Sequence, residues 1–243
     1  MGMKRTRRDF VGACLLASTA LVLGGCASSS QPEPRPEIRR IAVIPVVPPE
    51  RLYVDNRSTA LLLFPLPTLV ADPILNRRKS TLFNEKMESV RLQLGMKLTD
   101  EVLQALKAEG FEASIVHDVK RPHNDPEGVE YTSLDPKDAV LRVGFSTVGM
   151  HSSRFSNDYQ PRVNAWASLL ARPDPKAWAA EDYFYYGADA SRTPDAWNIP
   201  AAEKYRYPTF EALIDKADEV SEGYDVALRD LVQHIAKQLR AQL

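Results

Sequence analysis

Hydrophobic and polar residues alternate along the chain with two different periods, which predict a mixture of strands and helices. Residues 39–47 (RRIAVIPVV) contain a continuous apolar run, as is typical of a strand that is buried on both faces. Residues 85–109 place apolar side chains three and four positions apart. They predict a helix with Asn84 as its cap and Gly110 at its end. Residues 111–116 then alternate with the period of a strand.

The second half of the chain predicts a meander of strands followed by two helices. Residues 139–150, 162–171 and 177–186 have the composition and alternation of strands. Residues 209–220 predict a short helix, and Ser221 is placed to cap a final helix. The apolar stripe of this final helix consists of Tyr224, Ala227, Leu228, Leu231, Val232, Ile235 and Leu239.

The predicted order is therefore β-α-β-β-β-β-α. This order indicates an α/β (α+β) fold, with two main helices packed on a mostly antiparallel sheet of about five strands. We expect residues 38–243 to form this single domain. An insertion at residues 48–79 is the exception, since Pro65, Pro67 and Pro73 argue against a regular helix or a central strand there.

The N-terminal segment has the three regions of a secretory signal peptide. Residues 1–8 are basic, and residues 11–23 form an uncharged run that is short for a membrane span. Small residues then lead to Cys26, so we expect residues 1–25 to be removed by cleavage between Gly25 and Cys26. Two arginines in the basic region also resemble a twin-arginine signal, which leaves the Sec and twin-arginine routes both open.

The end of this segment, Leu23-Gly24-Gly25-Cys26, resembles a bacterial lipobox. The resemblance implies that the Cys26 thiol is diacylated and that its new amine is acylated after cleavage. Because each buried methylene contributes about 0.8 kcal/mol, three acyl chains would hold the protein on a membrane. No aspartate follows Cys26, so by resemblance to the sorting rule of such lipoproteins we expect the outer membrane, with the domain facing the periplasm.

The composition of the mature chain limits the functions that it can have. Of two cysteines, Cys14 lies in the removed segment, so only Cys26 remains and no disulfide is expected. The formal net charge is −1, and no basic stripe with interleaved aromatic residues is present, which argues against nucleic-acid binding. Residues 26–37 are polar and proline-rich and predict a disordered tether.

The sequence predicts no catalytic residues, no metal site and no cofactor. It lacks a Gly-x-Ser-x-Gly elbow, a phosphate loop and a Gly-x-Gly-x-x-Gly motif. His117 and His123 lie in a polar loop without ligand spacing, which favours a solvated loop over a metal site. His151, Ser152 and Asp158 are too close in sequence to favour a catalytic triad. An enzyme that uses His117 or His151 is the least favoured alternative.

Residues 60–70 are the main candidate for a binding surface. They are strongly apolar but interrupted by proline, so their apolar area is covered either by a partner or by the core of the domain. The tyrosine-rich strand at residues 183–186 is a second candidate, either as a ligand platform or as core. The residues expected to form a partner or ligand surface are Leu62, Leu63, Phe64, Leu66 and Leu69.

The chain resembles small bacterial envelope lipoproteins in residues 40–45 (RIAVIP), 98–106 (LTDEVLQAL) and 110–113 (GFEA). This group includes curli-secretion lipoproteins, lipoprotein activators of penicillin-binding proteins, and auxiliary lipoproteins of ABC transport systems. The resemblance implies a non-catalytic accessory or scaffold subunit that binds a protein partner in the envelope. The alternative is a periplasmic protein that binds a lipid or another small ligand.

The lipobox leads to a direct test. We expect Cys26→Ser to lose its acyl chains and to leave the membrane fraction, because the variant lacks the thiol that is acylated. Labelling of cells with a palmitate analogue, followed by fractionation, measures both effects. Cys14→Ser is the matched control and should be acylated like the unaltered protein. A Cys26→Ser protein that is still labelled and still membrane-bound would contradict the lipobox.

Overall fold

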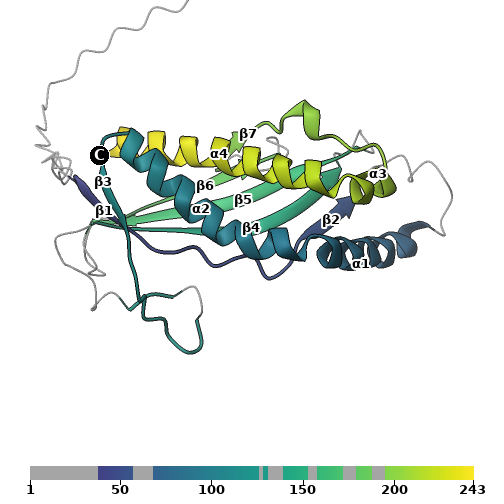
Figure 1. The fold of residues 1–243 in the computed structure, drawn as a ribbon, viewed down its shortest axis with the longest axis horizontal. Helices are drawn as coiled ribbons and strands as arrows, with labels where there is room; N and C mark the ends of the chain where they lie inside the picture. Colours follow the sequence, from purple (N-terminus) through teal and green to yellow (C-terminus); the bar gives the residue numbers. More distant parts are fainter. Residues whose placement is uncertain are drawn as a thin grey trace, which may run out of the picture. The chain divides into compact units, whose positions relative to one another are not determined.

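Seven strands of the described part of the chain form one mixed sheet (Figure 1). The computed structural model describes residues 38–56, 68–125, 128–130, 139–152, 158–171, 179–187 and 195–243, except for the side chains of residues 68–75. The strands are β1 (Arg40–Val43), β2 (Tyr53–Asn56), β3 (Glu112–Ile115), β4 (Ala139–Ser152), β5 (Tyr159–Leu170), β6 (Ala179–Tyr186) and β7 (Trp197–Ile199).

The sheet combines long antiparallel pairings with short parallel ones. Its strand order is β3-β1-β4-β5-β6-β7, and β2 pairs with β4. The antiparallel pairs are β4 with β5 and β5 with β6, which follow one another in the chain. The pairs β1–β3, β1–β4, β2–β4 and β6–β7 are parallel and short. The meander of β4, β5 and β6 is therefore the frame to which the short strands are added.

β1 and β2 lie one after the other beside β4. Ile41 pairs with Ala139 near the start of β4, and Tyr53 pairs with Gly149 near its end. Residues 44–52 connect the two short strands without forming a strand themselves. This side of β4 is therefore covered by an interrupted strand.

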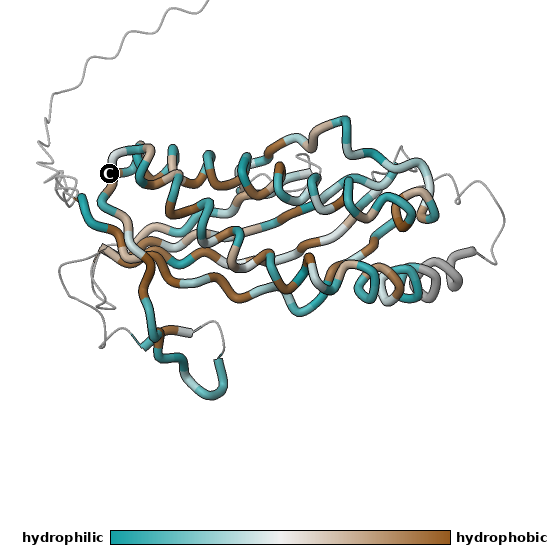
Figure 2. Tube along the Cα trace, viewed as in Figure 1, coloured by the Kyte–Doolittle hydropathy of each residue, from teal (hydrophilic) through white to brown (hydrophobic). Residues whose placement is uncertain are grey.

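Helices cover one face of the sheet (Figure 1). Both α2 and α4 lie across that face, and α1 lies beside β2. In Figure 2, the strands beneath the helices are rich in hydrophobic residues. Among the described residues, no helix has the length and apolar character needed to span a membrane. The helices are α1 (Thr68–Lys86), α2 (Glu88–Ala108), the 3-10 helix η4 (Glu203–Tyr205), α3 (Phe210–Asp215) and α4 (Ala217–Gln242).

The predicted α/β fold is confirmed, and its core is formed by the predicted apolar stripes. All seven residues of the final-helix stripe are buried in α4. The strand predicted at residues 39–47 is present only in its first part, as the interior strand β1, and residues 44–47 do not form a strand. Gly110 ends the helix before β3 with a φ of 87°, a conformation that glycine adopts without strain. The pattern of hydrophobic residues did not predict the short strands β2 and β7.

Three expectations about the helices are wrong. Pro73 lies inside α1, in its second turn, where proline removes one backbone hydrogen bond and the later turns pack beside β2. Ser221 does not cap the final helix, because α4 begins at Ala217, which brings Val220 into the buried stripe. The helix predicted from residue 85 is divided at Met87 into α1 and α2.

Side chains of α1 satisfy the outer edge of β2. Asn84, which was expected to cap a helix, lies within α1. It accepts a hydrogen bond from the Leu52 N–H at 2.7 Å and donates one to the Leu52 carbonyl at 2.5 Å. Ser80 accepts a hydrogen bond from the Val54 N–H at 3.0 Å. Because the edge groups of a strand otherwise recruit another strand, α1 both completes and protects this edge.

Side chains of α2 hold the connecting segment in the same way. Thr99 accepts a hydrogen bond from the Val46 N–H at 2.9 Å, and Arg91 donates one to the Pro49 carbonyl at 2.9 Å. The close approach of α2 to residues 46–48 depends on Gly95, because a Cβ atom there would lie 2.5 Å from the Val46 oxygen. The backbone of α2 therefore packs directly against the backbone of residues 46–48.

Gly95→Ala tests this contact. At an ordinary helix position, replacing glycine with alanine stabilises a protein by up to about 1 kcal/mol. We expect Gly95→Ala instead to lower the free energy of unfolding by about 1–3 kcal/mol, because the added methyl group forces α2 and residues 46–48 apart. Urea unfolding measures the change. Gln93→Ala, at an exposed position of α2, is the control, and a stabilised Gly95→Ala would contradict the contact.

Two buried tyrosines lack hydrogen bonds to their hydroxyl groups within the described residues. The hydroxyl oxygens of Tyr207 and Tyr224 have no partner there, although the two residues are only 1% and 0% exposed. Burial, with a smaller contribution from the charge of Glu219, raises the pKa of Tyr207 to about 12. Burial also raises the pKa of Tyr224 well above its ordinary value. Both phenols are therefore held in the neutral form.

These tyrosines predict a loss of stability at high pH. Tyrosine in the unfolded chain ionises near pH 10, whereas folded Tyr207 ionises at about 12, so its contribution is complete below pH 10 and is lost as the pH rises toward 12. Tyr207→Phe should reduce this loss and should not lower stability at pH 8. The control is Tyr159→Phe, which removes an accepted hydrogen bond and should cost about 1 kcal/mol at pH 8. Urea unfolding at pH 8 and 11 measures both, and an unchanged alkaline loss in Tyr207→Phe would contradict the assignment.

Candidate functional site

The face of the sheet opposite α2 and α4, here called the second face, carries a row of arginine and aromatic residues. Strand alternation directs Arg142, Trp166 and Tyr183 to this face, since their neighbours Leu141, Ala165 and Phe184 belong to the core beneath the helices. Trp166 is paired with Tyr183 on the adjacent strand.

Trp166 is fixed by its neighbours on β4. Its ring fills the space that a side chain at Gly144 would need, so the indole lies against the backbone of β4. The guanidinium carbon of Arg142 is 5.3 Å from the centre of the Trp166 ring, within the range of a cation–π contact. A rigid aromatic surface results.

Tyr183 and Tyr185 continue this surface onto β6. Tyr183 is 39% exposed, and its hydroxyl donates a hydrogen bond to Glu181 Oε1 at 2.6 Å. That hydrogen bond and the charge of Glu181 raise the pKa of Tyr183. We name Arg142, Trp166, Tyr183 and Tyr185 together the arginine–aromatic patch.

A cleft of about 430 Å³ lies beside the patch, toward the carboxyl ends of β2 and β4. Its floor is the second face of β2, β4 and β5, and α1 provides a wall. In the floor, Gly149 is paired with both Tyr53 and Arg162, and the backbone of Tyr53 lies where a side chain at Gly149 would be. The cleft is lined by Arg51, Tyr53, Val54, Asp55, Asn76, Arg77, Ser80, Thr147, Gly149, Met150, His151 and Arg162.

Arginine dominates the charge of this cleft. Three arginines, Arg51, Arg77 and Arg162, line it together with one carboxylate, Asp55. Arg51 is positioned by Tyr53: its Nε donates a hydrogen bond to the tyrosine hydroxyl at 2.8 Å, and its guanidinium carbon lies 4.7 Å from the ring centre. The two terminal nitrogens of Arg51 carry its other donors.

Asp55 and His151 form an acid–imidazole pair at the end of the cleft. The two residues are paired across β2 and β4, and Asp55 Oδ2 lies 4.0 Å from His151 Nδ1. His151 is 5% exposed. This is the partner that the structure gives to the histidine considered above for catalysis.

Ser152 does not belong to the same group as His151, because adjacent strand residues face opposite sides of the sheet. On the helix side, the Ser152 hydroxyl donates a hydrogen bond to Asn56 Oδ1 at 2.8 Å. Asn56 and Lys79 both donate to the Tyr159 hydroxyl, at 3.2 and 2.9 Å. This buried network ties the ends of β2, β4 and β5 to α1 and stabilises the floor of the cleft from below.

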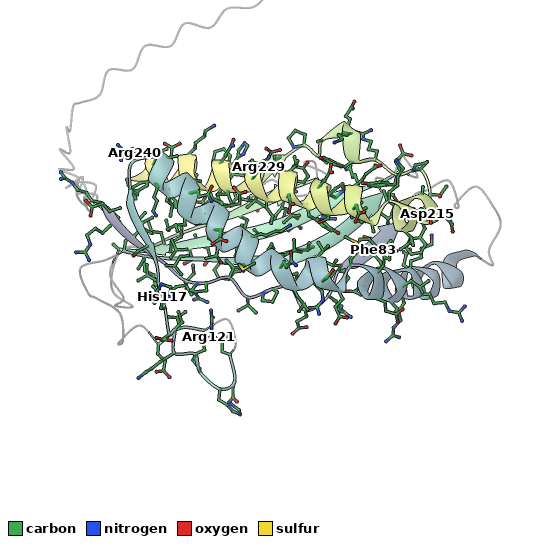
Figure 3. The ribbon with its side chains drawn as sticks, viewed as in Figure 1. Phe83, His117, Arg121, Asp215, Arg229 and Arg240 are labelled. Carbon is green, nitrogen blue, oxygen red and sulfur yellow. The ribbon has the colours of Figure 1, made fainter. Side chains whose placement is uncertain are left out.

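Most of the predicted site residues are outside the described part of the chain. Gly25, Cys26, Leu62, Leu63, Phe64 and Leu66 are outside the described residues, and Leu69 falls in the first turns of α1, where only the backbone is described. His117 lies in the loop after β3, at the other end of the sheet from β2 (Figure 3). Within the described ranges, no group of three or more potential metal ligands occurs.

The cleft residues were not recognised in the sequence. Arg51 and Asp55 flank or belong to a four-residue strand that has no extended hydrophobic pattern. Arg162 was a detectable signal, because it occupies a polar position of an alternating strand. Its place in the row with Gly149 and Tyr53 depends on the register of β4 with β5 and with β2, which is distant in sequence.

Fold and site together define an α/β domain with one face under helices and a second face that carries an arginine-lined cleft. Comparison with known proteins adds little to this definition. No protein-family model and no curated protein matches the chain. The chain is similar to a crystal structure described as that of an uncharacterized protein, at 9% identity and a TM-score of 0.28. The similarity covers 81% of this chain and 92% of the other.

Proposed function

We propose that this protein is a lipid-anchored accessory lipoprotein of the bacterial envelope, which binds a protein partner and does not catalyse a reaction. The acyl chains on Cys26 would hold it on the outer membrane, and residues 26–37 would carry the domain into the periplasm. The observation that carries the proposal is the arginine–aromatic patch on the second face of the sheet.

The composition of the patch is that of a protein-binding surface. Tyrosine, tryptophan and arginine are enriched in protein interfaces and in their energetically dominant positions, whereas lysine is depleted. β4, β5 and β6 contain no lysine at all. Trp166 is already fixed against Gly144 and Arg142, so binding through it costs little side-chain entropy.

Charge indicates the kind of partner surface. Arg142 and Arg162 contribute positive charge to the second face, although the chain as a whole has a formal net charge of −1. A partner surface that carries carboxylates beside apolar groups complements this combination of guanidinium and aromatic groups.

Site-specific crosslinking in living cells tests the proposal. A photoreactive amino acid at Tyr183, in the full-length lipoprotein, should give a reproducible adduct with one envelope protein. Arg142→Glu should lower the adduct yield about ten-fold, because charge reversal at an interface arginine costs at least about 1.4 kcal/mol. Thermal unfolding of the variant confirms that it still folds.

The control places the photoreactive residue at Leu92, which is 54% exposed on the outer side of α2. This position should not give the same adduct. The proposal is wrong if position 183 gives no protein adduct, if both positions capture the same proteins, or if folded Arg142→Glu is captured as efficiently as the unaltered protein.

A further inference from the structure

We propose that the cleft between α1 and the second face is a binding site for a small oxyanion, which is a carboxylate or a phosphate group on a small molecule. The inference goes beyond the proposed protein partner and rests on different residues. It is based on the positions of three arginines, on the contacts by which Tyr53 holds one of them, and on the size of the cleft.

The arginines come from three elements that are far apart in the sequence. Arg51 precedes β2, Arg77 lies on α1 and Arg162 lies on β5, yet all three line one cleft. A guanidinium group presents a planar fork of donors that matches the two oxygens of a carboxylate or phosphate. Asp55 is the single carboxylate among the described residues of the lining, and these residues together carry an excess of positive charge on a chain of formal net charge −1.

Contacts within the cleft hold one of its arginines in place before a ligand binds. Tyr53 holds the guanidinium of Arg51 through a hydrogen bond and ring contact, which reduces the entropy lost when Arg51 binds an anion. Gly149 lets β2 approach β4 closely, because a side chain there would collide with the backbone of Tyr53, and this approach brings Tyr53 to the cleft floor beside Arg162.

The dimensions limit the ligand. A volume of about 430 Å³ is within the range of roughly 300–1,000 Å³ that is usual for small-molecule sites. Arg51 and Arg77 are exposed, so the charged group has direct access from solvent. Tyr53, which is 40% exposed, also lines the cleft and provides an aromatic contact for the body of the ligand.

Calorimetric titration of the full-length lipoprotein in neutral detergent tests the site. The probes are inorganic phosphate, glycerol 3-phosphate and succinate, each added at constant ionic strength. At least one should bind, and Arg51→Gln and Arg77→Gln should each weaken it about ten-fold, as expected for loss of one charge-assisted pair. Binding of the phosphates or of succinate identifies which oxyanion is recognised.

Arg229→Gln is the matched control, because Arg229 is a half-exposed arginine on α4 on the other side of the sheet. It should leave probe affinity unchanged. The site is refuted if no probe binds up to 10 mM, roughly the weakest affinity that a specific site of this kind would show. It is also refuted if folded Arg51→Gln and Arg77→Gln bind as tightly as Arg229→Gln. Crosslinking from position 183 is measured separately, so a failure of either proposal is distinguishable from a failure of the other.

Discussion

The side-chain hydrogen bonds from α1 and α2 to residues 46–54 are the interaction on which the rest of the structure depends. β1 and β2 are each four residues long, and the chain between them forms no ladder with a second strand on its outer side. Thr99, Asn84 and Ser80 supply the missing partners for the backbone. Because an unsatisfied buried backbone group costs about 1–3 kcal/mol, this segment would not remain extended beside β4 without the helices.

The same interaction builds the cleft. α1 provides one wall and β2 part of the floor, and the bonds from Ser80 and Asn84 fix these two elements against each other. The network from Ser152 through Asn56 to Tyr159 then ties the strand ends together on the helix side. The hydrogen bonds from Ser80 and Asn84 to the backbone of residues 52–54 therefore set where Arg51 and Arg77 lie relative to each other.

An element can be predicted from the sequence when the residues that form it are close together in the chain. The stripe of α4 and the run in β1 are local patterns, and both form the kind of element that was predicted, although with other bounds. β2 has no such local pattern. It is held by hydrogen bonds to Asn84 and Ser80, which lie about thirty residues away in the sequence. The cleft is harder to predict than β2. The row Tyr53–Gly149–Arg162 can be recognised only when the register of β2, β4 and β5 is known.

The two glycines of β4 show how one strand supports two different surfaces. At Gly144, the neighbouring strand provides Trp166, whose ring fills the space and creates a flat aromatic surface. At Gly149, the backbone of Tyr53 occupies the place of the missing side chain, and the paired Arg162 lines the cleft with charge. A flat aromatic surface suits the side chains of a protein partner, whereas a charged hollow suits a small anion. Both proposals thus follow from which side chain β5 places opposite a glycine.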